Sequence, residues 1–359
     1  MGTQEYEANI TNLMPFYMYR PHNTHGMRYE FQGWISAKDY LSGKSDVTPI
    51  TEFIVEGDST YYAFYKEQDC TTKHSRKDYF YFPGDGKTIC LKDKYRTVIK
   101  EPITLPLKNG NIGLTTVADF GFRGRGDVIG KNQIPAIYFE NSGAGGDYKI
   151  IQDDAFCAAP NGDASSVDMN NCQMLLSEIY LPNSITTIGE AAFTGCRYLE
   201  TVQLPDTTQS DVGVTKIGTN AFSYTGKIQI LEGALSKLST IGVAAFYNAG
   251  NGVYLASVPE NLKEIKGWAF AHCGNVRPGD FSKVTSIGQH AFDTSNLYEI
   301  INIVLPTDLS GFSNECFTNY SIGRINTITY VSGNYVDPDT LTRLGITASN
   351  PVTIEQIIE

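Results

Sequence analysis

A six-residue pattern of apolar and small residues recurs along most of the chain. It begins with Ile, usually followed by Gly, and it ends with a small residue followed by Phe. Five clear copies occupy residues 188–193, 217–222, 241–246, 265–270 and 287–292, and divergent copies occupy 117–122, 151–156 and 312–317. Successive final Phe residues are 22 to 37 residues apart. A short unit with occasional insertions is typical of a solenoid built from stacked repeats.

A second apolar pattern precedes several copies of the first. It reads Leu-x-x-Ile-x-Leu-Pro at 176–182 and Leu-x-x-Val-x-Leu-Pro at 199–205, with weaker versions at 103–106, 137–139, 228–230, 253–255 and 303–306. Apolar–polar alternation predicts a short, half-buried strand, and the Pro that follows ends it. In the first pattern, an aliphatic residue and a Phe five positions apart favour a short helical turn. Each unit is therefore predicted to be strand, turn, short helical turn, turn.

One unit alone cannot bury its apolar face, so we expect the units to stack around a continuous core. The strands should form a parallel sheet with rungs about 4.8 Å apart, and the Phe residues should line up in a buried column. The small residue before each Phe indicates close approach between units, and the Gly after Ile permits a tight turn or a positive φ. Alternation places the central strand residues on the outer face, where we expect Tyr138, Tyr180, Gln203, Gln229 and Tyr254.

Together the two patterns resemble those of the BspA-type leucine-rich repeat family. Residues 192–196 and 269–273 also carry the Ala-Phe-x-x-Cys form of its repeat. The resemblance covers about residues 103–331. It implies a repeat solenoid, a right-handed stack of parallel strands with short helical turns, found on bacterial or parasite surfaces and used for adhesion or partner binding. That family has no catalytic residues to transfer, and this chain departs from it in two long early units and in a divergent last copy.

The residues before about 69 do not show the repeat. Residues 26–34 lead through aromatic residues to Trp34, and residues 54–65 end in a Tyr-rich alternation. This arrangement resembles the Listeria–Bacteroides repeat, which is related to the internalin B repeat, although extra residues interrupt its Gly-Tyr position at 26–29. The resemblance covers roughly residues 19–67. It implies a small β-grasp-like unit with an aromatic core, of a kind that serves as an extracellular spacer or binding module.

These patterns divide the chain into four expected parts. They are the β-grasp-like domain at 1–69, a hairpin junction at 70–102, the repeats at 103–333 and a C-terminal cap at 334–359. Two strands around a Pro-Gly-Asp-Gly turn at 78–91 predict a hairpin that caps the first repeat. At the other end we expect a strand at 326–331, a short helix at 338–344 and a closing strand at 352–354.

Composition and charge narrow the classes of partner. The chain has 359 residues, of which 41% are hydrophobic and 12% aromatic, and its formal net charge is −11. That charge disfavours non-specific binding to nucleic acids or anionic membranes. No apolar run approaches the ~20 residues that span a bilayer. The N-terminus lacks the pattern of a secretory leader, so we consider two interpretations: a secreted protein trimmed of its leader, or a virion component that never had one.

The seven cysteines are too few for a disulfide-stapled chain. Cys196 and Cys273 occupy matching repeat positions three units apart, too far for a bridge, and are expected to be small buried hydrophobes. Two candidate bridges are Cys157–Cys172 and Cys70–Cys90. No Cys-x-x-Cys occurs, so a zinc site is not supported.

Other candidate chemistry is weak. His22 with His25, and an acidic group at Asp153, Asp154, Asp163 and Asp168, lack the spacing of an established metal site. His272 and His290 fall in repeat turns and are expected to be surface or satisfied polar groups. Residues 125–127 read Arg-Gly-Asp, which integrins recognise, but a flexible turn explains them as well. No Ser-His-Asp arrangement can be assembled, and we predict no enzyme activity, no metal and no cofactor.

The sequence therefore predicts a non-enzymatic adhesin or interaction protein, secreted or at the cell surface. Its partner would be a host or microbial surface protein or glycan, bound on an extended solenoid face with the five outward Tyr and Gln residues. The alternative is a phage virion or appendage component that assembles with itself or binds a host surface. An enzyme would instead require a cleft with convergent titratable groups. The ligand and the oligomeric state stay open.

Overall fold

We analysed a computed structural model of the chain. The structure describes residues 19–21, 27–42, 47–49, 61–69, 77–123, 132–140, 148–159, 174–182, 184–203, 213–226, 228, 235–250, 258–273, 280–293, 301–317, 325–331, 338–346 and 353–357. The chain divides into two compact units, Met1–Lys73 and His74–Glu359. The four-part division expected from the sequence stays a prediction. No described helix has the length and apolar character that crossing a bilayer requires.

The N-terminal unit contains a three-stranded antiparallel sheet. Its central strand β2 (Met27–Ser36) pairs with β1 (Tyr19–Pro21) and β3 (Tyr61–Asp69). A register shift at Gly33, which has a φ of 139°, marks a β-bulge in β2. The hydroxyl of Ser36 caps α1 (Ala37–Leu41) by accepting the backbone N–H of Asp39 at 3.1 Å. The strands predicted around Trp34 and 61–65 are confirmed, whereas the likeness to the Listeria–Bacteroides repeat stays a prediction.

The second unit begins with the predicted hairpin. After η2 (Lys77–Tyr79), strand β4 (Phe80–Tyr81) pairs antiparallel with β5 (Thr88–Leu91). Strand β5 then pairs in parallel with β9 (Thr116–Val117), so the hairpin forms one end of the larger sheet. This end of the sheet is therefore an antiparallel strand pair instead of an open repeat, as a cap requires.

The side chain of Arg96 fastens this cap to the first coil. It lies at the end of α2 (Asp93–Arg96) and is 4% exposed. Its guanidinium donates to the carbonyl oxygens of Leu91 and Phe120 at 3.3 Å and of Gly121 at 3.1 Å. It also pairs with the carboxylate of Asp93 at 2.8 Å. The planar guanidinium, which carries five N–H donors, can satisfy several carbonyls that no preceding coil covers.

Nine strands form the longer of two sheets in the solenoid. Seven of them are only two residues long and end at the Ile or Val that opens the first sequence pattern. They are β9, β11 (Ile150–Ile151), β13 (Thr187–Ile188), β15 (Lys216–Ile217), β16 (Thr240–Ile241), β17 (Glu264–Ile265) and β18 (Ser286–Ile287). The pairing is parallel, with the apolar residues in register. The pattern therefore starts in a strand and continues in a tight turn, where we had expected a short helical turn.

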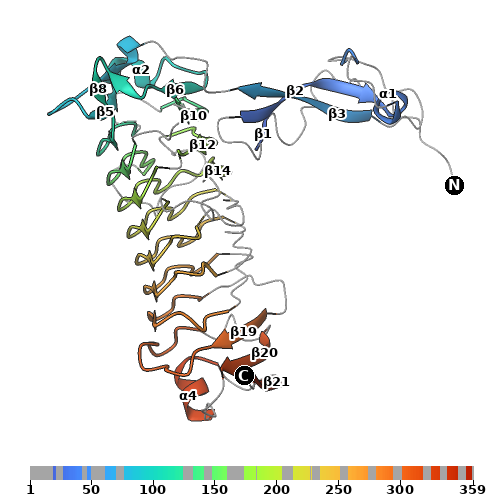
Figure 1. Cartoon of the computed structure of the whole chain (residues 1–359), viewed down its shortest axis with the longest axis vertical. Helices are drawn as coiled ribbons and strands as arrows, with labels where there is room; N and C mark the ends of the chain where they lie inside the picture. The colour runs from blue at the N-terminus through green and yellow to red at the C-terminus, as the bar shows by residue number, and fades with distance from the viewer. Residues whose placement is uncertain are drawn as a thin grey trace. The chain divides into compact units, whose positions relative to one another are not determined.

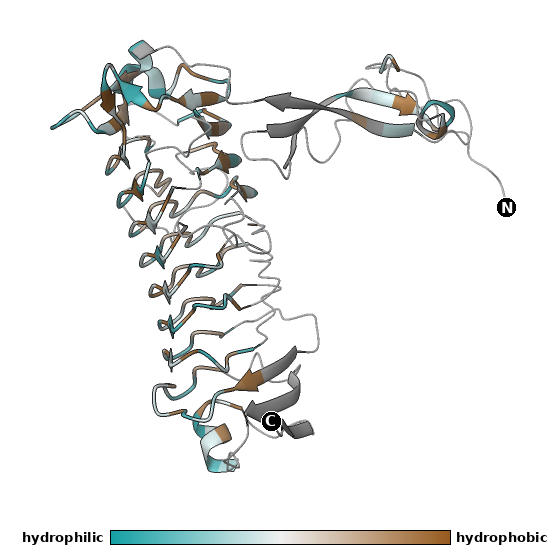
Figure 2. Cartoon of the chain, viewed as in Figure 1, coloured by the Kyte–Doolittle hydropathy of each residue, from teal (hydrophilic) through white to brown (hydrophobic). Residues whose placement is uncertain are grey.

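The second sheet contains the strands that the sequence predicted. It consists of β6 (Ile103–Leu105), β10 (Ala136–Phe139), β12 (Glu178–Tyr180) and β14 (Thr201–Gln203), all parallel. The weaker strands expected at 228–230 and 253–255 lie, apart from Ile228, outside the described residues. The coils stack one above the next, with apolar and polar residues alternating along each of them (Figures 1 and 2). The core lies between the two sheets.

The turn that follows each short strand has a repeating backbone conformation. The residue two positions before the Phe has a positive φ, between 49° and 60°, in all eight copies; these residues are Phe120, Asp154, Ala191, Asn220, Ala244, Trp268, His290 and Glu315. Alternate N–H groups of the turn donate to the next coil, as from Asn220 to Val243 at 2.9 Å and from Phe222 to Ala245 at 2.7 Å. Hydrogen bonding between coils therefore continues beyond the strands, which makes the turns rigid.

We expected the Gly after Ile to permit a tight turn or a positive φ; it has no positive φ in the described copies and instead allows close packing. A Cβ on Gly218 would lie 2.6 Å from the carbonyl carbon of Gly189, and one on Gly242 would lie 2.5 Å from that of Gly218. The backbones of successive coils touch at this position. The left-handed conformation falls two residues later, on residues other than Gly.

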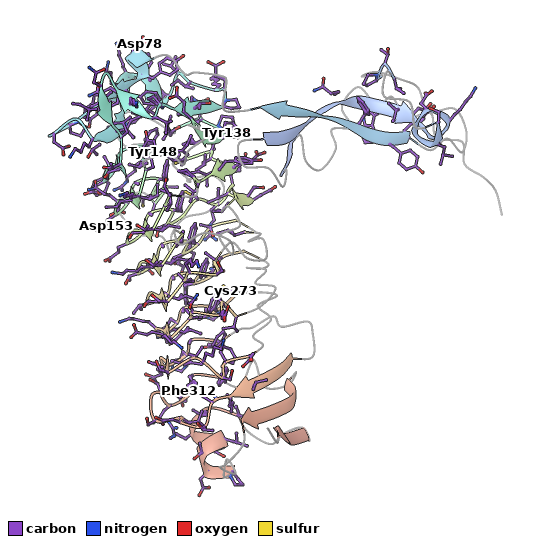
Figure 3. The ribbon with its side chains drawn as sticks, in the orientation of Figure 1. Asp78, Tyr138, Tyr148, Asp153, Cys273 and Phe312 are labelled. Atoms are coloured by element: carbon purple, nitrogen blue, oxygen red, sulfur yellow. The ribbon has the colours of Figure 1, made fainter. Side chains whose placement is uncertain are left out.

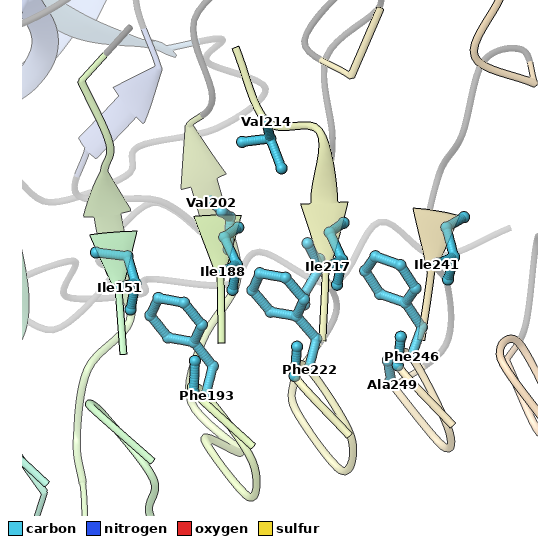
Figure 4. Packing of buried hydrophobic residues seen from close by; sticks show 14 of the residues in the cluster. Ile151, Ile188, Phe193, Val202, Val214, Ile217, Phe222, Ile241, Phe246 and Ala249 are labelled. Atoms are coloured by element: carbon cyan, nitrogen blue, oxygen red, sulfur yellow. The ribbon is translucent and has the colours of Figure 1, made fainter. Parts of the chain in front are cut away.

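The predicted column of Phe residues is confirmed. The rings of Phe156, Phe193, Phe222, Phe246 and Phe270 stack with centroids 5.0 to 5.4 Å apart and with planes within 7° of parallel. Figure 4 shows three of these rings beside the Ile residues of the short strands. Every member of this column is at most 1% exposed.

The described cysteines are buried free thiols. Cys90 and Cys157 are free, so neither candidate bridge forms. Cys196 and Cys273 are fully buried, as predicted, and their thiols donate to carbonyl oxygens of another coil, those of Phe156 at 3.1 Å and Phe246 at 2.6 Å. Burial raises the pKa of Cys273 to about 12. These thiols therefore pack and hydrogen-bond, and they are poor nucleophiles.

The C-terminal cap matches the elements expected there. Strand β20 (Ile325–Val331) lies in parallel between β19 (Ile301–Leu305) and β21 (Thr353–Ile357), and α4 (Pro338–Arg343) lies between β20 and β21 in sequence. The carbonyls of Arg343 and Leu344 accept the N–H groups of Glu315 and Phe317. The end of α4 thus takes the place that a further coil would occupy.

Candidate binding surface

Two of the five predicted binding residues are not on the surface. Tyr138 is 3% exposed and Tyr180 is 1% exposed, so the expectation that they face outward was wrong. Their rings pack 4.8 Å apart, and the Tyr180 hydroxyl donates to the Glu178 carboxylate at 3.1 Å. Every residue of β10 and β12 is buried. Alternation correctly placed these Tyr on the face of the strands opposite to the core. That face is also buried, as is common for parallel sheets.

The other three predicted residues are not tested. Gln203 ends β14, but its side chain lies outside the description. Gln229 and Tyr254 also lie outside the described residues. Their role in binding stays a prediction. Also outside the described residues are His22, His25, the Arg-Gly-Asp sequence at 125–127, Asp163 and Asp168, for which the sequence favoured no site.

The structure instead brings together a row of aromatic side chains on the turns of four successive coils. We call it the aromatic row and define it as Tyr224, Tyr247, Trp268, His272 and His290. Each of the five lies within two residues of the Phe that ends its copy of the six-residue pattern. Trp268 is 38% exposed, His272 is exposed, and the other three are half-buried.

Each ring of the aromatic row contacts the next. Tyr224 lies 5.4 Å from Tyr247, and Tyr247 lies 6.3 Å from Trp268 and 5.1 Å from His272. Trp268 lies 4.4 Å from His290. The interplanar angles run from 40° to 85°, which are tilted or edge-on arrangements that aromatic pairs favour. The row is therefore a connected surface and not a set of separate exposed rings.

Groups of opposite charge lie at its two ends. The Arg197 guanidinium lies 4.9 Å from the centroid of the Tyr224 ring, within the range of a cation–π contact. At the other end, His290 Nε2 lies 3.6 Å from Glu315 Oε2, and the Gln289 amide donates to the same oxygen at 3.3 Å. These polar groups can orient a ligand that lies along the rings.

The backbone holds the row in place. Tyr224, Trp268, His272 and His290 have φ between 55° and 60°. The N–H of Tyr224 donates to the carbonyl of Tyr247, and that of His272 to Asp293. Because the turns are bonded from coil to coil, the row loses little backbone entropy on binding.

This surface was not expected from the sequence, because binding was assigned to the strands. His272 and His290 were expected to be surface or satisfied polar groups. His272 is exposed, whereas His290 is half-buried and its Nδ1 has no hydrogen-bond partner among the described residues. Neither was connected with its aromatic neighbours. A usable signal was present. Aromatic residues or His occur just before or after the Phe in four consecutive copies, from residue 222 to residue 292.

Two other features of the described residues lead to no chemistry. A pocket of about 420 Å³ in the cap is lined by Tyr79, Tyr95, Val98, Ile99, Lys100 and Glu101. Acidic turns carry Asp119, Asp153 and Asp154; burial and the two neighbouring carboxylates raise the pKa of Asp119. Asp153 lies at the turn side of its coil (Figure 3). No group of His, Cys, Asp and Glu among the described residues has the geometry to hold a metal ion.

The repeats match a known family model. The model describes a BspA type leucine-rich repeat region and matches in six copies, over residues 169–297 and 215–336. Residues 169–336 are a BspA-type leucine-rich repeat region. This BspA-type region contains the whole aromatic row. The match to the family model supports the general conclusion that this is a surface interaction protein. Proteins of this family are typically non-enzymatic.

Solved structures of two leucine-rich repeat proteins are also similar. The leucine-rich repeat protein of T. pallidum is 18% identical, with 65% of this chain and 86% of that chain covered and a TM-score of 0.37. A leucine-rich cell surface protein from Faecalibacterium prausnitzii A2-165 is 17% identical, with 80% and 95% covered and a TM-score of 0.23. No curated protein matches the sequence. At these TM-scores neither likeness bears on how the BspA-type region is used.

Proposed function

We propose that this protein is an extracellular or cell-surface adhesin that binds its partner through the aromatic row. The row is the observation that carries the proposal. Aromatic side chains are the residues that binding surfaces favour, because they supply large contact areas with few rotatable bonds. Here five of them are contiguous and partly exposed on rigid turns.

The location at a surface is supported by the kind of repeat. BspA-type repeats are typical of surface proteins, and residues 169–336 match the model of that family. The net charge of −11 favours partners other than nucleic acids and anionic membranes. A stack of coils with connected turns presents one extended edge, which suits adhesion better than catalysis.

An array experiment on the whole chain tests this proposal. The protein would be screened against immobilised glycans and host surface proteins, and each hit would be repeated with a Tyr247→Ala, Trp268→Ala double variant. We expect the double variant to lose the hits. The matched control is Ile150→Ala, because Ile150 is an exposed apolar residue of β11 outside the row. Hits that the double variant keeps in full would overturn the proposal.

A further inference from the structure

We propose that the aromatic row binds a neutral, extended β-linked polysaccharide that runs from coil to coil. This inference rests on the proposed function and adds the chemical class of the ligand. Three observations support it: the kinds of side chain in the row, the spacing of these side chains along the coils, and the polar groups beside them.

The exposed rings suit the faces of sugar rings. A pyranose in its chair form presents axial C–H groups on its faces and hydroxyl groups around its edge. The C–H groups pack on an aromatic ring, whose face carries partial negative charge. Trp268 has the largest ring of the row, lies near the middle of the row and is 38% exposed. It lies between Tyr247 on one side and His290 on the other, so a sugar on Trp268 has aromatic neighbours in both directions.

The spacing of the row suits an extended chain. Neighbouring rings from successive coils lie 5.4, 6.3 and 4.4 Å apart, around the ~4.8 Å spacing of the rungs of a sheet. One sugar residue of an extended β-linked chain advances by about the same length. Successive sugars therefore meet successive coils. An α-linked chain that winds into a helix would leave the row after one or two residues.

Polar side chains beside the rings can bond to hydroxyl groups. Gln289 is exposed and Asn248 is half-buried, and an amide both donates and accepts hydrogen bonds, as a hydroxyl does. The Glu315 carboxylate at one end accepts only. With a net charge of −11 the chain repels sulfated or uronic polysaccharides, so the charge favours a neutral one.

A protein partner fits the row less well. The residues that dominate protein interfaces are usually buried in well-packed pockets at the centre of the contact. A row of partly exposed rings that continues from coil to coil offers a repeated contact instead. A repeating ligand uses the contact at each coil.

Tryptophan fluorescence tests the inference directly. The chain has two Trp residues, Trp34 and Trp268, so a Trp34→Phe variant of the full chain reports on the row alone. The probes are neutral β-(1→4)-linked gluco-, manno- and N-acetylglucosamine oligosaccharides of two to six residues, with α-linked malto-oligosaccharides as controls. We expect at least one β-linked series to shift the emission, with an affinity that rises with length and levels off near the four coils of the row. The α-linked series should have no effect.

Variants separate this inference from the proposed function. Trp268→Ala should lower the affinity for the β-linked ligand at least tenfold on arrays, and Ile150→Ala should leave it unchanged. If no β-linked glycan binds while a protein ligand still depends on Trp268, the inference is overturned and the proposed function stands. If no ligand depends on the row, both fall. Equal binding of α- and β-linked series would also contradict the extended ligand.

Discussion

The rings of Phe193 and Phe222 lie parallel, with centroids 5.0 Å apart and planes 2° from parallel. Phe222 and Phe246 repeat this relationship at 5.4 Å and 5°. The spacing is close to the ~4.8 Å between rungs of a parallel sheet. Each ring therefore stacks on its counterpart one coil away. A shift of one coil by one residue would break both the ring stack and the pairing of the Ile residues, so the column fixes the register.

Phe222→Ala should lower the free energy of unfolding by about 3–5 kcal/mol, the usual cost of removing a buried aromatic side chain. The ring is 1% exposed and has a stacked ring on either side. Urea unfolding followed by circular dichroism would measure the loss. The control is Val243→Ala, an exposed residue one coil away, which should change stability by less than ~0.5 kcal/mol. A loss below ~1 kcal/mol for Phe222→Ala would contradict the interpretation that the Phe column stabilises the core.

Gly218→Ala should destabilise the stack although it adds only one methyl group. The new Cβ would lie 2.6 Å from the carbonyl carbon of Gly189, and backbone cannot move aside as a flexible side chain can. We expect a loss of about 2–3 kcal/mol, in the upper part of the range for overpacking. Gly267→Ala is the matched control, since its Cβ would come no closer than 3.1 Å to the Gln289 oxygen. Equal losses for the two variants would rule out contact between coils as the reason for Gly.

Ala244→Gly should hold or raise stability, against the usual effect of this substitution. Ala244 has a φ of 51°, and a left-handed conformation costs an L-residue roughly 1–2 kcal/mol, a cost that Gly does not bear. The greater freedom of Gly in the unfolded chain offsets about 0.5–1 kcal/mol of this gain. The adjacent Ala245→Gly is the control. Ala245 is fully buried and lacks a positive φ, so its substitution should destabilise. A larger loss at Ala244 than at Ala245 would contradict this account.

The sequence predicted the periodic parts of the fold because the same physical constraint repeats in every coil. An Ile and a Phe at fixed spacing must enter the core of each coil, and the column and the in-register Ile pairs confirm this. The local conformation between Ile217 and Phe222 was not predictable in the same way. A spacing of five fits a helical turn, but the N–H groups of Asn220 and Phe222 donate to the next coil, whereas that of Ala221 donates to Gly218 of its own coil.

The site was predicted less well, because a single strand does not show what covers its second face. The alternation around Tyr138 and Tyr180 correctly separated the two faces. Whether the second face meets solvent depends on segments far away in sequence. The aromatic row depends likewise on contacts between coils, such as that of Trp268 with His290. Only stacking in three dimensions turns single residues of separate repeats into one surface.

Tyr180→Ala should therefore lower stability substantially, whereas a Tyr180 on the outer face, as the sequence predicted, would tolerate the change with almost no loss. Tyr180 is 1% exposed, and its ring packs on that of Tyr138. We expect a loss of about 3 kcal/mol or more, as for other buried aromatic side chains. Tyr180→Phe keeps the ring and removes only the hydroxyl that donates to Glu178, which should cost about 1 kcal/mol. A melting temperature unchanged in Tyr180→Ala would show that the second face of this sheet meets solvent.

Stability should fall steeply in alkaline solution because buried thiols resist ionisation. Burial raises the pKa of Cys157, Cys273 and Cys316 from 9.0 to about 12, and it raises the pKa of Tyr148 well above 10. The folded state keeps these protons at a pH where the unfolded chain loses them. Their contribution to stability is therefore complete below pH 9 and is lost progressively as the pH rises toward 12.

Urea unfolding at intervals between pH 8 and pH 11 would measure this dependence. The decisive comparison is with Cys273→Ala, which removes one of the raised pKa values and should fall less steeply above pH 9. Its stability at pH 8 is compared separately, because the substitution also removes a buried thiol and its hydrogen bond to Phe246. Parallel curves for the two proteins above pH 9 would mean that Cys273 ionises as readily in the folded chain as in the unfolded one. That result is incompatible with a thiol that is buried between coils, and it would mean that the stack around Cys273 is in contact with water.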